Sequence, residues 1–482
     1  MRDFLVIVGG RVLTAIVTLI GIRWVTILLS VEQYGFLNLL ISFQVFCGLF
    51  LVNPVGQHIN RHTHQWLDEG SMLSRLVIYR RYIVLVGLIG MLVCLAWIQG
   101  QTIPLTEKFL YSLMVGLMVV AATWNATYIP LLNMMGLRSA SVAWGAFTII
   151  IALLFSLILT YIYPVALSWF TGQMLGFGLG AWVASRQFQQ HLLPTSQQGK
   201  WPLVDKQSVW HYCVPLAIAT GFMWVQLSGY RFVLAHYWGL SALGFAMVGL
   251  VLANQLWGLL ESLLMQFVLP LFFKRISAAS NSQGAEAFSD LLAALGPIYI
   301  VLAAATILAS SALLALFIDP RYANAHSFVA LGALIECCRV LGNLLSNAAQ
   351  ISRKMKALIL PYASGAVVIV LSLIWFGEHH YSIDAAIVSV VFGGLAMLLV
   401  MLWRMKKELS FTLLNWRWLV ALLSLIIAIA AMELELLPKV LMPLDALIYV
   451  VCVGAASLLL LGGLLWKNPA LQRLLAVKLM ET

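Results

Sequence analysis

The chain has 482 residues, of which 62% are hydrophobic and only 10% are charged. This composition excludes an ordinary soluble domain and a disordered chain. The formal net charge of +10 would suit nucleic-acid binding, but its meaning depends on where the basic residues lie.

Long apolar segments recur along the whole chain. A membrane-spanning helix needs about 20 predominantly apolar residues, and 14 segments meet this requirement. The opening stretch "MRDFLVIVGG" runs into the first segment without a small-residue cleavage site, so we expect no cleaved signal peptide. The sequence therefore predicts an all-α polytopic membrane protein of about 14 transmembrane helices. The predicted spans are 4–29, 36–55, 76–99, 108–134, 139–163, 165–187, 211–237, 241–271, 289–318, 324–350, 356–377, 382–404, 414–432 and 439–466.

The basic residues divide unevenly between the predicted loops. Of the 28 lysines and arginines, 21 fall in loops and at span ends on one side of the membrane, three fall outside on the opposite side (Lys108, Arg321, Lys439), and four lie deeper within spans (Arg11, Arg23, Arg231, Arg339). Lysine and arginine concentrate in cytoplasmic loops. We therefore expect a multi-pass protein of the bacterial inner membrane with both termini in the cytoplasm. The charge then serves topology and contact with anionic lipid, not nucleic acid.

An internal repeat predicts two lobes. The stretches "IRWVTILLSVEQYGF" (22–36) and "YRFVLAHYWGLSALGF" (230–245) share an arginine beside an aromatic residue, a short break and a Gly-Phe pair. Six spans separate their starts, so the two halves have the same orientation, and such parallel repeats place a substrate site between two lobes near the middle of the membrane. The predicted organisation is a six-helix lobe at 1–190, a cytoplasmic linker at 191–210, a six-helix lobe at 211–408, and two further helices with a tail at 409–482.

The four arginines and two glutamates in the predicted spans need an explanation, because a charge in the bilayer is costly and rare without a function. Arg23 and Arg231 occupy matching positions in the repeat, which suits two cations facing a shared cavity; the alternative is that both extend to the external interface. Arg11 lies about one-third of the way into the first span. It either faces the cavity or extends to the cytoplasmic interface. Gln226 is a weaker candidate, since amides in spans often only join helices.

The span at 324–350 carries a polar stripe. Glu336, Arg339, Asn343, Asn347 and Gln350 recur at helical spacing and fall on one face. Such a stripe cannot face lipid, because its groups would lack partners there. It therefore either packs on a polar face of another helix or lines a water-filled cavity, and the i,i+3 pair of Glu336 and Arg339 can also neutralise itself.

A second polar face is predicted in the span at 241–271, where Asn254, Trp257, Gly258 and Glu261 follow the i, i+3, i+4, i+7 pattern. An acidic group in a span can titrate or hold a cation. Glu261, with Glu336, is therefore a candidate for ion coupling, and the alternative is a buried partner for one of the arginines.

Enzymatic and metal chemistry find little support. His58 and His62 are four residues apart, but no glutamate follows the first histidine as it does in the zinc helix motif. The six cysteines lie in or beside apolar segments without metal-ligand spacing. We expect no enzyme, no metal site and no resident cofactor.

Several stretches resemble the bacterial polysaccharide exporters, the flippases of O-antigen-type lipid-linked oligosaccharides. The opening "GGRVLTAIVTLIGIRWVTILLSVEQYGFLNLL", with its Tyr34-Gly35 pair, is similar to the start of that family. "VPLAIATGFMWVQLSGYRFVLAHYWGLSALGF" resembles its seventh and eighth helices, and "DPRYANAHSFVALGAL" the approach to its tenth. Where many members have Asp-Arg in the seventh helix, this chain has Tyr230-Arg231, which puts any role of that acid in question here.

The resemblance implies two six-helix lobes that export an undecaprenyl-pyrophosphate-linked glycan by alternating access, and it allows drive by a proton or sodium gradient. Arginines suit the pyrophosphate. Amides and aromatic rings suit the sugars. Substrate-binding candidates are therefore Arg11, Arg23, Arg231, Arg339, Asn254, Trp257, Asn343, Asn347 and Gln226. The expected partners are this lipid-linked glycan, membrane lipid and other polysaccharide assembly proteins, and a monomer would suffice.

Three other functions compete with this prediction. An ion-coupled multidrug or small-molecule exporter of the same superfamily would favour acidic groups over arginines. A membrane glycan polymerase or ligase would need a sizeable external loop, and the predicted external loops are short. A structural partner in an envelope assembly complex would leave the charges in the spans unexplained.

Overall fold

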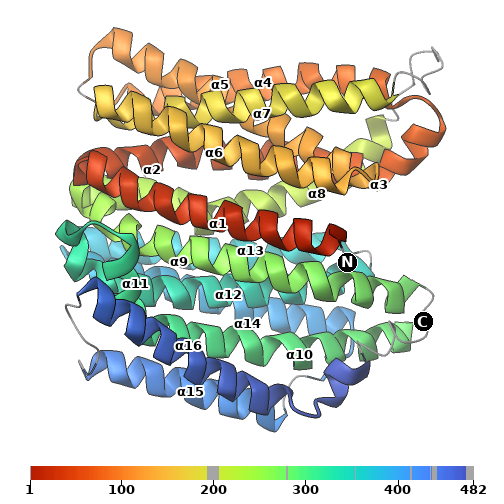
Figure 1. Ribbon diagram of the computed structural model, residues 1–482, viewed down its shortest axis with the longest axis vertical. Coiled ribbons are helices and arrows are strands. Elements are labelled where there is room, and N and C mark those ends of the chain that lie inside the picture. Colours follow the sequence, from red (N-terminus) through yellow and green to blue (C-terminus); the bar gives the residue numbers. More distant parts are fainter. Residues whose placement is uncertain are drawn as a thin grey trace. The chain divides into compact units, whose positions relative to one another are not determined.

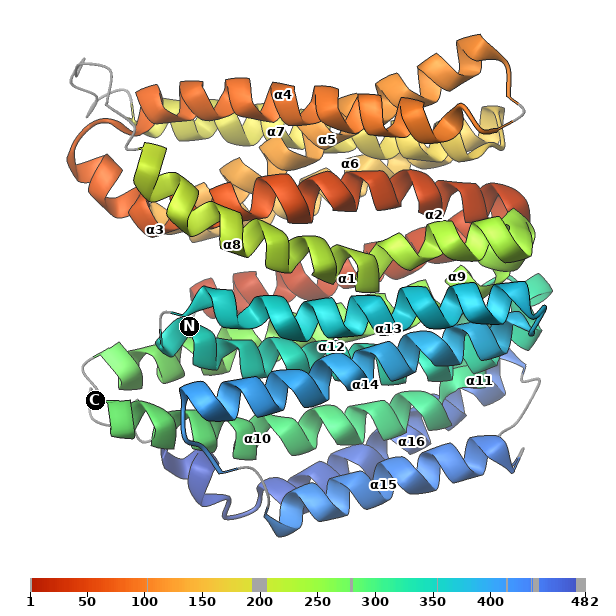
Figure 2. The ribbon, with the colours of Figure 1, turned by 180° about the vertical axis from the view of Figure 1, so that it is seen from behind.

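The computed structural model describes residues 2–101, 103–192, 206–277, 281–352, 354–412, 415–434, 436 and 442–473. Within these ranges the backbone forms sixteen α-helices, two π-helical segments and two 3-10 segments, and it contains no strand (Figures 1 and 2). The all-α fold expected from the sequence is confirmed.

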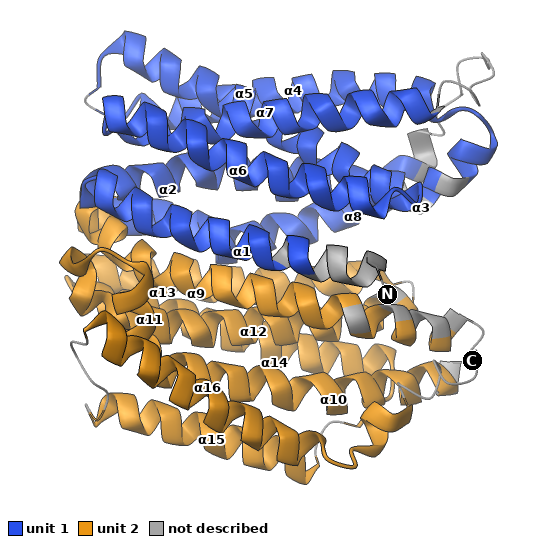
Figure 3. Ribbon diagram, viewed as in Figure 1, with its two compact units in different colours: residues 1–235 blue, residues 236–482 orange. Residues whose placement is uncertain are grey.

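The chain divides into two compact units, residues 1–235 and 236–482 (Figure 3). Unit 1 contains α1 (Arg2–Leu28), α2 (Val31–Phe46), η1 (Cys47–Val52), α3 (Asn53–Asp68), α4 (Met72–Ile98), α5 (Leu105–Met134), α6 (Arg138–Ile162), α7 (Ala166–Leu192), α8 (Lys206–Trp224), η2 (Val225–Gly229) and the start of α9 (Tyr230–Ser277). Unit 2 contains the rest of α9, α10 (Asn281–Leu308), α11 (Ser310–Phe317), η3 (Pro320–Ala325), α12 (His326–Ile351), η4 (Met355–Leu358), α13 (Ile359–Glu378), α14 (Ile383–Glu408), α15 (Trp416–Glu433) and α16 (Pro443–Leu465).

The helices account for the predicted spans. Eleven described helices are long and apolar enough to cross a membrane, and one of them, residues 212–266, holds two predicted spans. A shorter apolar helix, Val12–Leu28, corresponds to the first span. The remaining span, 165–187, coincides with α7, which is not among the eleven. The protein is therefore a multi-pass membrane protein.

Small residues allow α7 to pack closely against α6. A Cβ added at Gly172 would lie 2.3 Å from the Ser156 Cα, and one at Gly176 would lie 2.3 Å from the Ala152 Cα. Both partners belong to α6, so the two backbones touch along this line. Membrane helices associate through such small-residue contacts, because lipid supplies no hydrophobic drive between them.

A kink at Gly239 separates the two spans inside α9. Its φ of 83° and ψ of 171° are not helical. This conformation favours glycine, which has no Cβ to clash with the backbone. The break predicted between 237 and 241 is confirmed.

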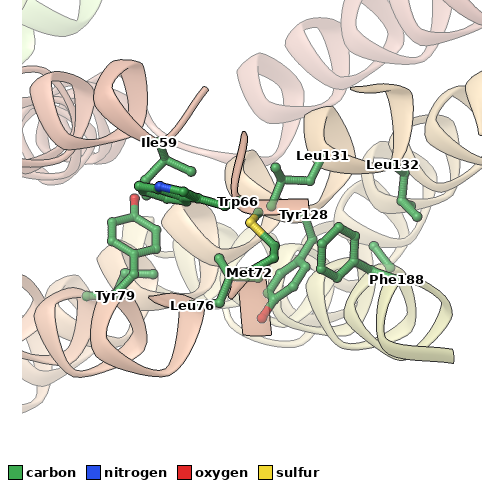
Figure 4. Packing of buried hydrophobic residues seen from close by; sticks show 11 residues of the cluster. Ile59, Trp66, Met72, Leu76, Tyr79, Tyr128, Leu131, Leu132 and Phe188 are labelled. Carbon is green, nitrogen blue, oxygen red and sulfur yellow. The ribbon is translucent and has the colours of Figure 1, made fainter. Parts of the chain in front are cut away.

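The core of unit 1 is built by α3, α4, α5 and α7. Trp66, Tyr79, Tyr128 and Phe188 are all buried in one cluster with aliphatic side chains, shown in Figure 4. The Tyr128 hydroxyl leaves this cluster to accept hydrogen bonds from the Arg80 Nε at 3.2 Å and Nη2 at 2.9 Å.

The unit boundary lies later in the chain than the predicted lobe boundary. Helix α8 packs on α3 and η1, so residues 211–235, assigned from the repeat to the second lobe, cluster with unit 1. The predicted linker at 191–210 falls largely outside the described residues. The lobe assignment at 1–190 and 211–408 stays a prediction.

The last two helices belong to unit 2. Helix α15 packs against α10, and α16 packs against α10 and α11 (Figures 1 and 2). The contact of α15 is close: a Cβ at Gly296 would lie 2.1 Å from the Trp418 ring. Ala304, Ala333 and Ala428 join α10, α12 and α15 in one small-residue cluster.

Candidate functional site

Unit 2 contains a ladder of polar side chains between α9 and α12. Asn254 Nδ2 donates a hydrogen bond to Glu336 Oε1 at 2.8 Å. Asn343 Nδ2 donates to Glu261 Oε1 at 3.1 Å. The two asparagine–glutamate pairs have the same separation of 82 residues along the chain. The equal separation means that α9 and α12 run parallel here, with one rung two helical turns from the other.

Arg339 joins the two rungs. Its Nη2 lies 2.8 Å from Glu261 Oε2, and its Nε lies 2.6 Å from Glu336 Oε2. The side chains are only 16% (Arg339), 17% (Glu261) and 6% (Glu336) exposed. A guanidinium is suited to this position, because its planar fork can donate to two carboxylates at once.

The ladder carries one negative charge in excess, since two carboxylates face one guanidinium. Each of the four carboxylate oxygens already accepts one N–H donor. A buried excess charge is costly in a medium of low dielectric constant, even when it is hydrogen-bonded. The ladder therefore places two carboxylates and one guanidinium together in a largely buried setting.

Two aromatic side chains lie in the same unit with free polar atoms. Trp257 and Tyr299 are 0% exposed, and their ring centroids are 6.4 Å apart. The Trp257 Nε1 and the Tyr299 hydroxyl have no hydrogen-bond partner among the described residues. Trp257, a predicted sugar-binding residue, packs on the Tyr299 ring, and its predicted role stays a prediction.

The polar stripe is therefore in contact with a polar face of another helix, the first of the two predicted alternatives. Glu336, Arg339 and Asn343 belong to the ladder. Asn347 instead donates to the Asn343 and Leu344 carbonyl oxygens of its own helix, and the Gln350 side chain lies outside the described residues. Glu261 is also a buried partner of an arginine, as one reading of the sequence expected.

Unit 1 contains a second polar cluster, around Arg231 at the start of α9. The Arg231 Nη1 lies 3.5 Å from both the Asn38 carbonyl oxygen and the Ser42 Oγ of α2. Its Nε is buried and has no hydrogen-bond partner among the described residues. Trp224, directly before η2, also contacts α2: its Nε1 donates a hydrogen bond to the Ser42 carbonyl oxygen at 3.0 Å.

Arg231 thus has long, weak contacts with neutral oxygens, and among the described residues no carboxylate pairs with it. A cation in this setting is incompletely compensated and favours an anionic ligand. Asn38 and Ser42 were not singled out in the sequence, although their i,i+4 spacing in "FLNLLISF" is a polar pair in an apolar span.

Aromatic rings surround this cluster. Phe232 lies 4.9 Å from Phe43 and 5.5 Å from Trp97, measured between ring centroids, and Phe46 lies 5.0 Å from Trp224. The π-helical segments η1 and η2 follow Phe46 and Trp224 directly. Such segments often occur at functional sites.

Arg11, Arg23 and Gln226 also fall in unit 1. Gln226 is buried in η2, and Arg23 is half-buried in α1. The Arg11 side chain lies outside the described residues. Arg23 and Arg231 therefore lie in the same compact unit, and their predicted position on two facing lobes stays a prediction.

No metal centre is found in the part of the chain that the structure describes, where no three His, Cys, Asp or Glu residues form a possible ligand group. The rings of His58 and His62 are tilted against each other with centroids 4.3 Å apart, and His62 stacks on Trp66.

Comparisons with known proteins place the fold. No protein-family model and no curated protein matches the sequence. Among solved structures, the lipid II flippase MurJ in an inward closed conformation aligns with a TM-score of 0.66 and 13% identity over 96% of this chain and 98% of that chain. An inward-facing multidrug resistance MATE transporter aligns with a TM-score of 0.55 and 11% identity over 83% and 94%. A transporter of the MOP superfamily from Pyrococcus furiosus aligns with a TM-score of 0.52 and 13% identity over 84% and 95%.

These structures are transporters or flippases, and none of the three is described as an enzyme. The chain covers nearly the full length of each. The fold of the chain is therefore similar to that of the lipid II flippase MurJ over almost its whole length, and to that of a MATE transporter over most of it.

Proposed function

We propose that the chain is a flippase that moves an undecaprenyl-pyrophosphate-linked oligosaccharide from the cytoplasmic to the periplasmic leaflet by alternating access. O-antigen, capsule or exopolysaccharide assembly would use such a step. The proposal is supported by the similarity to the lipid II flippase MurJ, and by the sequence resemblance to exporters of lipid-linked glycans.

The observation that carries the proposal is the setting of Arg231. Its buried Nε lacks a partner among the described residues, and its Nη1 makes only contacts of 3.5 Å to neutral oxygens. A pyrophosphate would supply charged oxygens to these donors, and arginine–phosphate hydrogen bonds are among the strongest in proteins. Arg23 and Arg11 are the further candidates for this anion.

The neighbouring groups suit the rest of such a substrate. Trp97, Trp224 and Phe232 offer rings on which sugars can stack, and Gln226 offers an amide for hydroxyl groups. In unit 2, Asn254, Trp257, Arg339, Asn343 and Asn347 remain candidates for polar contacts, although most of their hydrogen bonds are already made within the protein. The apolar tail of the substrate can stay in the bilayer.

The ladder in unit 2 is the proposed coupling site. Its excess negative charge would hold a proton or a sodium ion, at Glu261 and Glu336. Binding from one side of the membrane and release to the other would then favour one direction of transport.

Accumulation of lipid-linked glycan in cells that lack the gene tests the proposal. Wild-type protein should clear the intermediate from the cytoplasmic leaflet, and Arg231→Ala or Arg23→Ala at equal protein levels should leave it in place. Arg404→Gln, at the end of α14, is the matched control and should behave as wild type. If no glycan intermediate accumulates, the lipid-linked substrate is wrong.

An ion-coupled multidrug exporter is the second candidate. The similarity to a MATE transporter and the excess negative charge of the ladder favour it, because acidic groups suit cationic drugs. Loss of the gene would then sensitise cells to cationic compounds and leave lipid-linked glycans unchanged.

A further inference from the structure

A cavity of about 640 Å³ lies at one end of unit 2, apart from both polar clusters. It forms where the connection between α14 and α15 and the segment after α16 meet α10. Its charged lining residues are Glu286, Asp290, Arg417 and Arg473, and Ser289, Asn415 and Asn468 add polar groups. This end of the helices is the predicted cytoplasmic one.

The acidic group of the cavity is already compensated. Asp290 is 4% exposed, and its two oxygens accept from Arg473 at 2.6 Å (Nη2 to Oδ1) and 3.0 Å (Nε to Oδ2). Arg275 Nη1 lies 2.7 Å from the same Oδ2. The hydrogen bond to Asp290 raises the pKa of Arg473, which therefore stays charged. Two arginines are thus held in place by one buried carboxylate.

A third arginine adds a charge without a carboxylate partner. Arg417 Nε donates to the Leu464 carbonyl oxygen at 2.8 Å, and its guanidinium lies 4.8 Å above the Trp416 ring. Among the described residues no carboxylate pairs with Arg417, and its two Nη groups make no hydrogen bond. The other acid of the cavity, Glu286, is 59% exposed and lies 3.7 Å from Arg275. Arg275 does not line the cavity but offsets charge on both acids, so the three arginines outnumber the two carboxylates, and among the described residues the donors without a partner are those of Arg417.

The cavity lies at the level where lipid headgroups are expected. Trp416, directly before Arg417, is 54% exposed, and Trp466, directly after α16, is 72% exposed. Exposed tryptophans mark the boundary between membrane and water. From this level, α15 and α16 present large exposed aliphatic side chains such as Leu423, Ile426 and Leu459. Acyl chains beside these helices would bring a headgroup to the cavity.

We propose that this cavity binds the phosphate of an anionic phospholipid headgroup, with Arg417 as the residue that donates to the phosphate and Arg473 as the second cation. Basic pockets near the cytoplasmic surface suit anionic headgroups. The volume exceeds that of a phosphate group, and Phe411, Ala293 and Pro469 supply an apolar wall for the glycerol and the first acyl carbons. The shared chemistry is a phosphate ester, and its source is the membrane.

Lipid titration of the full-length protein in detergent tests the proposal, with bound lipids counted by native mass spectrometry. Phosphatidylglycerol should bind roughly tenfold more tightly than phosphatidylcholine, and Arg417→Gln should remove this preference. Arg404→Gln removes an arginine that pairs with Glu408 and does not line the cavity, so it should keep the preference.

Three results would overturn the proposal: equal binding of the two lipids by the wild type, an unchanged preference in Arg417→Gln, or displacement of phosphatidylglycerol by millimolar sn-glycerol 3-phosphate. The last result would identify a soluble phosphate ester as the ligand. The wild-type comparison and the competition do not depend on the folding of any variant.

Discussion

Arg339 of α12 lies between two glutamates from different helices, 2.8 Å from Glu261 on α9 and 2.6 Å from Glu336 on its own helix. The guanidinium therefore both joins the helices and offsets one of two buried negative charges. Removal of the guanidinium should increase the excess negative charge of the ladder, whereas removal of one glutamate should abolish it.

Arg339→Gln should destabilise the protein strongly, because it leaves two buried carboxylates without a cation. Breaking a buried ion pair by removing one partner costs about 3–5 kcal/mol. Thermal unfolding in detergent should show a clear fall in Tm. The triple variant Glu261→Gln, Glu336→Gln, Arg339→Gln has no buried charge and should recover most of the loss; equal Tm values for single and triple variants would contradict the electrostatic account.

Glu261→Gln should leave a neutral ladder, in which Arg339 and Glu336 balance. If the excess charge holds the coupling ion, transport by this variant in proteoliposomes should no longer respond to a proton or sodium gradient. Glu408→Gln is the matched control at the end of α14, where the carboxylate pairs with Lys354 at 2.8 Å. A gradient response equal to that of the wild type would exclude the ladder as the coupling site.

Arg231→Gln should weaken substrate binding roughly 10- to 100-fold, because hydrogen bonds to charged groups contribute about 1.5–3 kcal/mol. Arg231→Lys should recover only part of the affinity, because lysine keeps the charge but lacks the planar fork. Binding of a water-soluble lipid-linked glycan analogue to purified protein measures both. Lysine and glutamine variants that bind as well as the wild type would assign Arg231 a purely structural role.

Gly176→Val should disrupt the contact of α7 with α6. An added Cβ would lie 2.3 Å from the Ala152 Cα, so the backbones would have to separate. We expect the free energy of unfolding to fall by about 1–3 kcal/mol, as is typical of overpacked cores. Thermal unfolding in detergent should show this as a lower Tm. Gly145→Val in α6 is the control, since nothing lies within 4 Å of the corresponding Cβ. Similar Tm values for the two variants would argue against a close α6–α7 contact.

The sequence predicted the helices and the polar faces well, because both follow from periodicity within one segment. The break at Gly239 and the stripe through Glu336, Arg339 and Asn343 are of this kind. The partners were harder to predict: that Arg339 also pairs with Glu261 depends on the register between α9 and α12, which no local pattern encodes. Asn38 and Ser42 were not predicted as neighbours of Arg231 for the same reason, because only the packing of the helices brings them together.

The division into units shows a second limit. The repeat relates segments by their order in the chain, whereas the division into compact units depends on which helices contact each other. Residues 211–235 match the second half by order but cluster with the first by contact. Local sequence similarity contains no information about that choice.

The ladder also restricts how α9 and α12 can move. Because both rungs have the same separation along the chain, a slide by one helical turn would place Glu261 opposite Asn347 but Asn254 opposite Val340, which offers no side-chain acceptor. Glu261 would still have an amide partner, but Asn254 would lose its hydrogen bond to Glu336. Arg339 would no longer lie between the two glutamates. These contacts therefore favour the present register of α9 and α12, and if the chain transports as proposed, we expect the two helices to move together.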